Sequence, residues 1–263
     1  MPATCYWQHE TEPEARYTCL DGQSPVCPRC CVDHCAVETP VWFARCASAG
    51  HPTWPAVAQR RALPAKLVCL ESYWDAALFR EMSVKGFFEA LQPLLTPPLQ
   101  VAHRFVESRR GLAYYTRYPD GLLWKEPDAW NAPIYYLAFH GKPAAIKSVL
   151  DGIGADRLCD AFRGYGRCGY DNLVYFAACS VLRGRRGHQF AREFLKASGC
   201  RAVIGYTTDV NWMASLVTDL LFLHRFYSDP DPWRNLRAIF ASVHRDFRPA
   251  RELGHTLVLA DTT

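Results

Sequence analysis

The sequence has no hydrophobic run long enough to cross a membrane. A spanning helix needs about 20 consecutive apolar residues, whereas the most apolar segment, residues 213–226, is interrupted by Asp219 and His224. The first 17 residues contain three glutamates and no apolar run, which argues against a signal or transit peptide. We therefore expect a soluble, cytoplasmic protein with no membrane partner.

The sequence also lacks a strong excess of positive or negative charge. It contains no internal repeat and no low-complexity tract. Charged residues make up 21% of the chain and the formal net charge is only +4, which argues against nucleic acid as a partner. A length of 263 residues, 49% of them hydrophobic, suits one sizeable core and a small appendage.

Cysteine, by contrast, is plentiful and unevenly spread. Seven of the 12 cysteines lie between Cys5 and Cys46, together with His9, His34 and His51, and this mixture favours metal binding over disulfides. We predict a zinc-binding module over residues 1–51, a proline-containing linker over 52–65 and an α/β domain over 66–263.

The third region alternates short apolar runs with longer amphipathic segments. This pattern predicts a three-layer α/β sandwich, with helices on both faces of a six-stranded, mostly parallel sheet. The expected strands are 66–70, 99–106, 134–139, 173–178, 201–205 and 256–260. The expected helices are 83–95, capped by Ser83, then 156–162, 187–198, 211–227 and 233–247.

A histidine and a cysteine each follow a fully apolar strand. His140 comes after residues 134–139 and precedes Gly141, while Cys179 comes after residues 173–178. Catalytic groups gather at the carboxyl ends of parallel strands. A thiol needs a nearby histidine, positive charge or helix N-terminus to become a nucleophile, so His140 is the expected base, with Arg183 or Arg185 as the charge. The backbone N–H groups of Gly141 and Cys179 are the expected oxyanion donors.

These two segments resemble the His-Gly and Cys blocks of caspases, metacaspases and bacterial caspase-like proteases. The resemblance covers residues 66–260 and implies a cysteine endopeptidase that acts on a protein or peptide, with bacterial defence as a setting. Metacaspases place an acid two positions before the nucleophile, where this chain has Ala177. Asp209 and Trp212 follow the fifth strand, where related enzymes build the substrate pocket; alternatively, Asp209 simply begins a helix.

The N-terminal spacing resembles a B-box zinc finger, which implies one or two structural Zn²⁺ ions and a protein partner. The predicted ligands are Cys5, His9, Cys27 and Cys30 for one site, and Cys19 and His34 for a second. The remaining ligands of the second site stay open among Asp21, Cys31, Cys35, Cys46 and His51.

Two other functions compete with proteolysis. The chain could be a non-catalytic adaptor that uses both regions for protein binding, or a zinc-dependent nucleic-acid reader.

Overall fold

The structure is a computed structural model that describes residues 65–73, 82–117, 121–125, 132–165 and 171–260. It also describes the backbone of three short antiparallel strands, β1 (Tyr17–Thr18), β2 (Pro25–Val26) and β3 (Arg45–Cys46), in the order β2-β1-β3. The predicted zinc ligands lie outside the described residues, namely Cys5, His9, Cys19, Cys27, Cys30 and His34. All of the predicted 52–65 linker except residue 65 also lies outside them. No helix in the described part of the chain is long and apolar enough to span a membrane.

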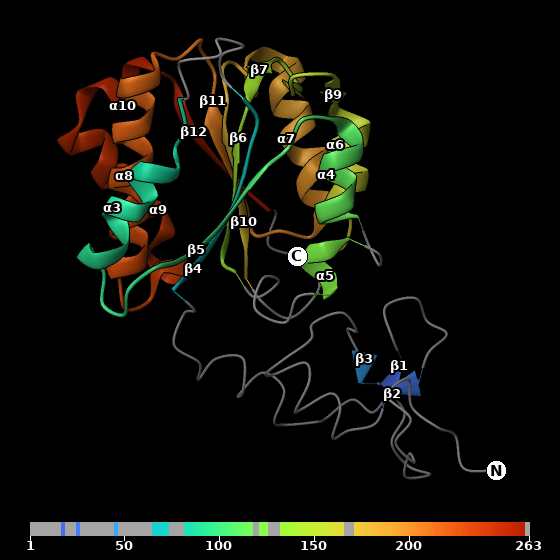
Figure 1. The fold of residues 1–263 in the computed structure, drawn as a ribbon. Coiled ribbons are helices and arrows are strands. Elements are labelled where there is room, and N and C mark those ends of the chain that lie inside the picture. Colours follow the sequence, from blue (N-terminus) through green and yellow to red (C-terminus); the bar gives the residue numbers. More distant parts are fainter. Residues whose placement is uncertain are drawn as a thin grey trace.

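A six-stranded sheet forms the centre of the α/β domain (Figure 1). Its strands are β4 (Lys66–Glu71), β5 (Gln100–Phe105), β6 (Ile134–Ala138), β10 (Leu173–Ala177), β11 (Ala202–Tyr206) and β12 (His255–Leu259), in the order β12-β11-β10-β6-β4-β5. Only β12 runs antiparallel to its neighbour, β11. The predicted sheet and its strands are confirmed to within about a residue at each end.

Helices cover both faces of this sheet. In Figure 1, α3 (Lys85–Leu91), α8 (Trp212–Ser228), α9 (Pro232–Asp246) and α10 (Arg248–Glu252) lie on one face. The other face carries α4 (Arg109–Thr116), α6 (Ala155–Ala161) and α7 (Gly184–Ser198), with α5 (Leu122–Lys125) at one end. The domain is therefore a three-layer sandwich, as the sequence predicts.

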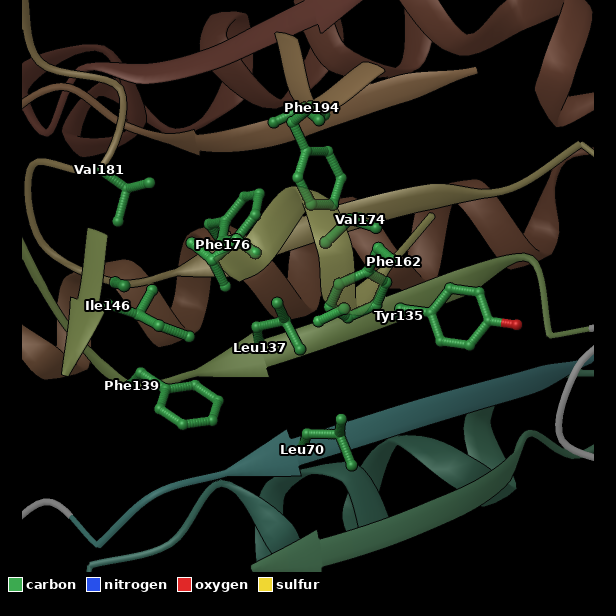
Figure 2. Packing of buried hydrophobic residues seen from close by; sticks show 14 of the residues in the cluster. Leu70, Tyr135, Leu137, Phe139, Ile146, Phe162, Val174, Phe176, Val181 and Phe194 are labelled. Carbon is green, nitrogen blue, oxygen red and sulfur yellow. The ribbon is translucent and has the colours of Figure 1, made fainter. Parts of the chain in front are cut away.

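The central strands are buried on both faces, which explains their continuous apolar sequences. All five residues of β6, β10 and β11 are buried. Figure 2 shows one core layer, in which Phe176 of β10 and Phe194 of α7 pack on the side of the sheet that also holds Leu137 and Ile146. A second apolar cluster joins the opposite sheet face to α3, α8 and α9.

Three boundaries of the predicted helices differ from the structure by two residues or more. The N-cap residue of α3 is Val84, so the helix begins two residues later than predicted. The predicted capping residue, Ser83, still accepts a hydrogen bond from the amide of Lys85 at 3.1 Å, and its hydroxyl donates to Glu71 at 2.6 Å. This helix ends at Leu91, before a 3₁₀ turn, η1 (Gln92–Leu94), because Pro93 lacks the N–H that a longer α-helix would need. Helix α7 begins three residues earlier than predicted. Its first turn contains two glycines, and their low helix propensity hides this turn from sequence-based prediction.

A small antiparallel sheet, which the sequence did not predict, adjoins the strand end that carries His140. It consists of β7 (His140–Lys142), β8 (Ala145–Lys147) and β9 (Gly152–Gly154), in that order. His140 lies opposite Lys147 in this register. Pairing with β8 therefore keeps residues 140–142, which follow β6, in an extended conformation.

Candidate active site

His140 and Cys179 follow two neighbouring strands by the same number of residues. Strands β6 and β10 are parallel and pair Ala138 with Ala177, so each of the two residues lies two positions beyond the last register pair. Adjacent strands lie about 4.8 Å apart. The topology therefore brings the imidazole and the thiol to one edge of the sheet, with His140 exposed and Cys179 half-buried.

Gly141 lies directly against the backbone of Cys179. A Cβ atom at position 141 would come within 2.2 Å of the carbonyl oxygen and 2.8 Å of the amide nitrogen of Cys179. Any larger residue would push the two segments apart. The His-Gly pair is thus explained by packing, since glycine lets the chain after β6 approach the chain after β10.

The loop after β10 is fixed by the loop after β11. Ser180 has a positive φ of 55°, its amide donates to the carbonyl of Thr208 at 2.8 Å, and its hydroxyl donates to the carboxylate of Asp209 at 2.5 Å. The backbone amide of Val210 donates to Sγ of Cys179 at 3.4 Å. This contact ties the sulfur to the chain after β11.

Both residues line one pocket with a volume of about 310 Å³. Ligand pockets typically enclose about 300–1,000 Å³. The lining consists of Met82, Val84, Tyr136, His140, Ala177, Cys179, Val210, Trp212, Ser215, Leu216 and Asp219. The pocket therefore places a thiol and an imidazole beside largely apolar walls.

Two hydrogen bonds from backbone amides to side chains stabilise the pocket walls. Asn211 caps α8 by accepting a hydrogen bond from the amide of Ala214 at 3.1 Å, and this fixes the first helical residue, Trp212. Across the pocket, the buried carboxylate of Glu71 accepts a hydrogen bond from the amide of Val84 at 3.0 Å.

Asp219 is the acid in the pocket lining, and the sequence analysis did not identify it as a site residue. Its carboxylate accepts hydrogen bonds from the hydroxyls of Tyr136 and Tyr175, at 2.5 Å each, and from that of Tyr206. The three tyrosines come from β6, β10 and β11, and the carboxylate comes from α8. Burial raises the pKa of Asp219 to about 7, although the three hydroxyl donors oppose this shift.

Two histidines extend this buried network toward α9. Nε2 of His255 lies 2.8 Å from the hydroxyl oxygen of Tyr175, and Nδ1 lies 3.3 Å from Nε2 of His244. Burial lowers the pKa of His255 well below its usual value, and it also lowers the pKa of His244, with a further contribution from Arg251. Both histidines are therefore neutral at pH 7.

The other predicted site residues occupy different positions. Trp212 lines the pocket, while Asp209 is exposed and accepts the hydrogen bond from Ser180. Arg183 and Arg185 are exposed at the start of α7, outside the pocket lining. Within the described ranges, no group of three or more His, Cys, Asp or Glu side chains could hold a metal ion.

Comparisons with known proteins find similar solved structures but no similar sequence family. No protein-family profile matches the chain, and no curated protein matches it. Among solved structures, the chain is similar to the complex of Porphyromonas gingivalis RgpB pro- and mature domains, with 10% sequence identity and a TM-score of 0.45. The match covers 76% of this chain and 48% of that chain, so this protein spans about half the length of its structural relative.

Proposed function

We propose that this chain is a cysteine endopeptidase of caspase-like type, with His140 and Cys179 as its catalytic pair. The observation that carries the proposal is their position two residues beyond paired parallel strands and in the lining of the same pocket. The amide of Val210 adds a hydrogen-bond donor to the sulfur. The sequence resemblance to caspase-like proteases, described above, points to the same chemistry.

The proposed reaction has two stages. His140 accepts the thiol proton of Cys179, and the thiolate attacks the carbonyl carbon of a peptide bond. The negative oxygen of the tetrahedral intermediate is held by the backbone amides of Gly141 and Cys179. The imidazolium gives its proton to the departing amine, and a water molecule then hydrolyses the thioester.

The pocket favours a substrate side chain with an apolar stem and a positive end. Trp212 and Val210 offer apolar surface, and Asp219 offers the one carboxylate among the described residues of the pocket lining. A cation beside Asp219 would favour its ionised form, so substrate binding and proton release would be linked. Asp209 remains a second candidate partner for a basic side chain, because it is exposed and adjacent to Val210.

Site-specific alkylation tests the nucleophile. Iodoacetamide at pH 7 should label Cys179 at least tenfold faster than Cys159, because burial raises the pKa of the Cys159 thiol to about 11. Peptide mapping by mass spectrometry assigns each label. His140→Ala should slow labelling of Cys179, and Cys159→Ala is the matched control that should not.

A peptide library tests the activity itself. We expect cleavage after Lys or Arg, lost in Cys179→Ala and in His140→Ala and retained in Cys159→Ala. Asp219→Asn should raise KM for these peptides more than it lowers the rate of Cys179 labelling. Uniform alkylation of all described cysteines together with an absence of cleavage would instead favour the adaptor function.

We also propose that residues 1–51 bind structural Zn²⁺ and recruit a protein partner or substrate. The support is the cluster of cysteines and histidines in this region, because thiolate and imidazole ligands suit tetrahedral zinc. A role in bacterial defence stays a prediction from the sequence resemblance.

A further inference from the structure

A second pocket, with a volume of about 410 Å³, lies between α4 and α6 on the opposite face of the sheet from α8. None of its lining residues belongs to the pocket of His140 and Cys179. The lining consists of Arg109, Arg110, Leu112, Ala113, Arg117, Ile153, Arg157, Asp160, Ala161 and Arg163. Among the described residues, this lining therefore contains five arginines, one acid and no lysine.

Most of this positive charge is not neutralised by the described part of the protein. Asp160 forms an ion pair with Arg163 at 2.6 Å. Within the ranges that the structure describes, the guanidinium groups of the other four arginines have no carboxylate within ion-pair distance. The nearby carboxylate of Asp151 accepts a hydrogen bond from the backbone amide of Arg109.

Two of these arginines also stand where a helix disfavours positive charge. Arg109 and Arg110 are the first two residues of α4, and no acidic residue lies in its first turn. The N-terminus of a helix carries a partial positive charge, so an anion there would be stabilised and a cation is not. Because the carboxylate of Asp151 already accepts the amide of Arg109 at this end of the helix, the four guanidinium groups without an ion-pair partner among the described residues, and not the helix N-terminus, favour an anionic ligand.

We propose that this pocket binds a small molecule that carries several phosphate groups. Arginine binds phosphate through two parallel hydrogen bonds, and each phosphate group contributes between about one and two negative charges. Four arginines in one pocket of this volume match a compact oligophosphate better than a peptide, which would need several acidic side chains in the same space. The buried side chains of Leu112 and Ile153 close the base of the pocket, and the partly exposed Ala113 gives the remaining part of such a ligand an apolar contact.

Calorimetric titration of the full chain with inorganic tripolyphosphate tests this site. We expect binding at one site per chain, with inorganic phosphate binding more weakly. Arg110→Gln combined with Arg157→Gln should weaken tripolyphosphate binding by roughly 100-fold, since each charge-assisted contact is worth about a factor of ten. Arg117→Gln provides a second, single variant that should weaken it by about tenfold.

The matched control carries the same charge change on another helix. Arg234→Gln combined with Arg237→Gln removes two exposed arginines from α9 and should leave tripolyphosphate binding within about twofold of wild type. Equal weakening in this control, binding that survives the pocket variants, or no binding would overturn the proposal. Tighter binding of a tetra-aspartate peptide than of tripolyphosphate would also overturn it and would assign the pocket to acidic peptides.

Discussion

At the scale of single residues, Gly141 is the position where the proposed site tolerates least change. An alanine there would place its Cβ 2.2 Å from the carbonyl oxygen of Cys179, so the chains after β6 and β10 would have to separate. We expect Gly141→Ala to lower the rate of Cys179 alkylation at least tenfold and to destabilise the fold by about 1–3 kcal/mol. Peptide mapping and urea unfolding measure the two effects.

A second glycine provides the control. Gly86 lies in α3, where an added Cβ would meet nothing within 4 Å. Gly86→Ala should leave alkylation of Cys179 unchanged and should stabilise the protein by up to about 1 kcal/mol, as alanine does in a helix. An equal loss of reactivity in both variants would contradict the role we assign to the contact between Gly141 and Cys179.

Asp219 predicts a specific dependence of stability on pH. Its folded-state pKa of about 7 lies above the ordinary value, so the folded protein holds a proton that the unfolded chain has released. The contribution of Asp219 to stability is therefore present below about pH 4 and is lost as the pH rises through about 7.

Comparing wild type with Asp219→Asn isolates this effect, because asparagine does not titrate. Between pH 5 and pH 8, the free energy of unfolding of wild type should fall relative to the variant by roughly 2–3 kcal/mol. Urea denaturation at a series of pH values measures the difference. A difference that stays constant with pH would show that the carboxyl group keeps an ordinary pKa.

The sequence predicted His140 and Cys179 as a pair but gave no signal for Asp219. Both paired residues directly follow apolar runs that can be recognised locally, and parallel strands bring such ends together. The partners of Asp219 are 13, 44 and 83 residues away, on three different strands. Only the strand order of the folded sheet brings those hydroxyls to one carboxylate.

At the scale of elements, the start of α8 governs one wall of the proposed active site. Asn211→Ala removes the hydrogen bond from Ala214 and should cost about 1 kcal/mol of stability. Because Trp212 is the first residue of this helix, the variant should also raise KM for cleaved peptides. We expect this rise in KM because the first turn of α8, which carries the Trp212 side chain, would fray without its cap.

Helix α9 supplies a matched cap that has no contact with the pocket. Asp231 accepts a hydrogen bond from the amide of Arg234 at 3.3 Å, which is the same capping geometry. Asp231→Ala should therefore lower stability by a similar amount while leaving KM unchanged. If both variants raised KM alike, general loosening of the fold would explain the result, and the wall would have no separate role.

The length of a strand decided whether the sequence could predict it. The six strands of the main sheet have five or six residues each and are marked by apolar composition. Strands β7, β8 and β9 have three residues each, too few for a periodic pattern to stand out. Their pairing depends on the surrounding fold, so the sequence predicted the strand end that carries His140 but not the small sheet that holds it.

At the scale of the whole molecule, the α/β domain has the apolar core that a fold of its own requires. Two large buried clusters lie on opposite faces of the sheet, and both consist of residues between Leu67 and Ala250. A module of about 50 residues has a much smaller capacity for burial and usually depends on metal or disulfides. The two regions should therefore respond differently when zinc is removed.

Treatment of the full chain with a strong chelator tests this difference. We expect the purified protein to contain one or two zinc ions, and their removal should expose the clustered cysteines between Cys5 and Cys46 to alkylation. The alkylation rate of Cys179 and the main thermal unfolding transition should stay unchanged, because the core of the α/β domain includes no predicted ligand. Protein that contains no zinc, or N-terminal cysteines joined as disulfides, would contradict the metal prediction. A matching loss of Cys179 reactivity would instead show that the zinc-binding region and the proposed active site are coupled.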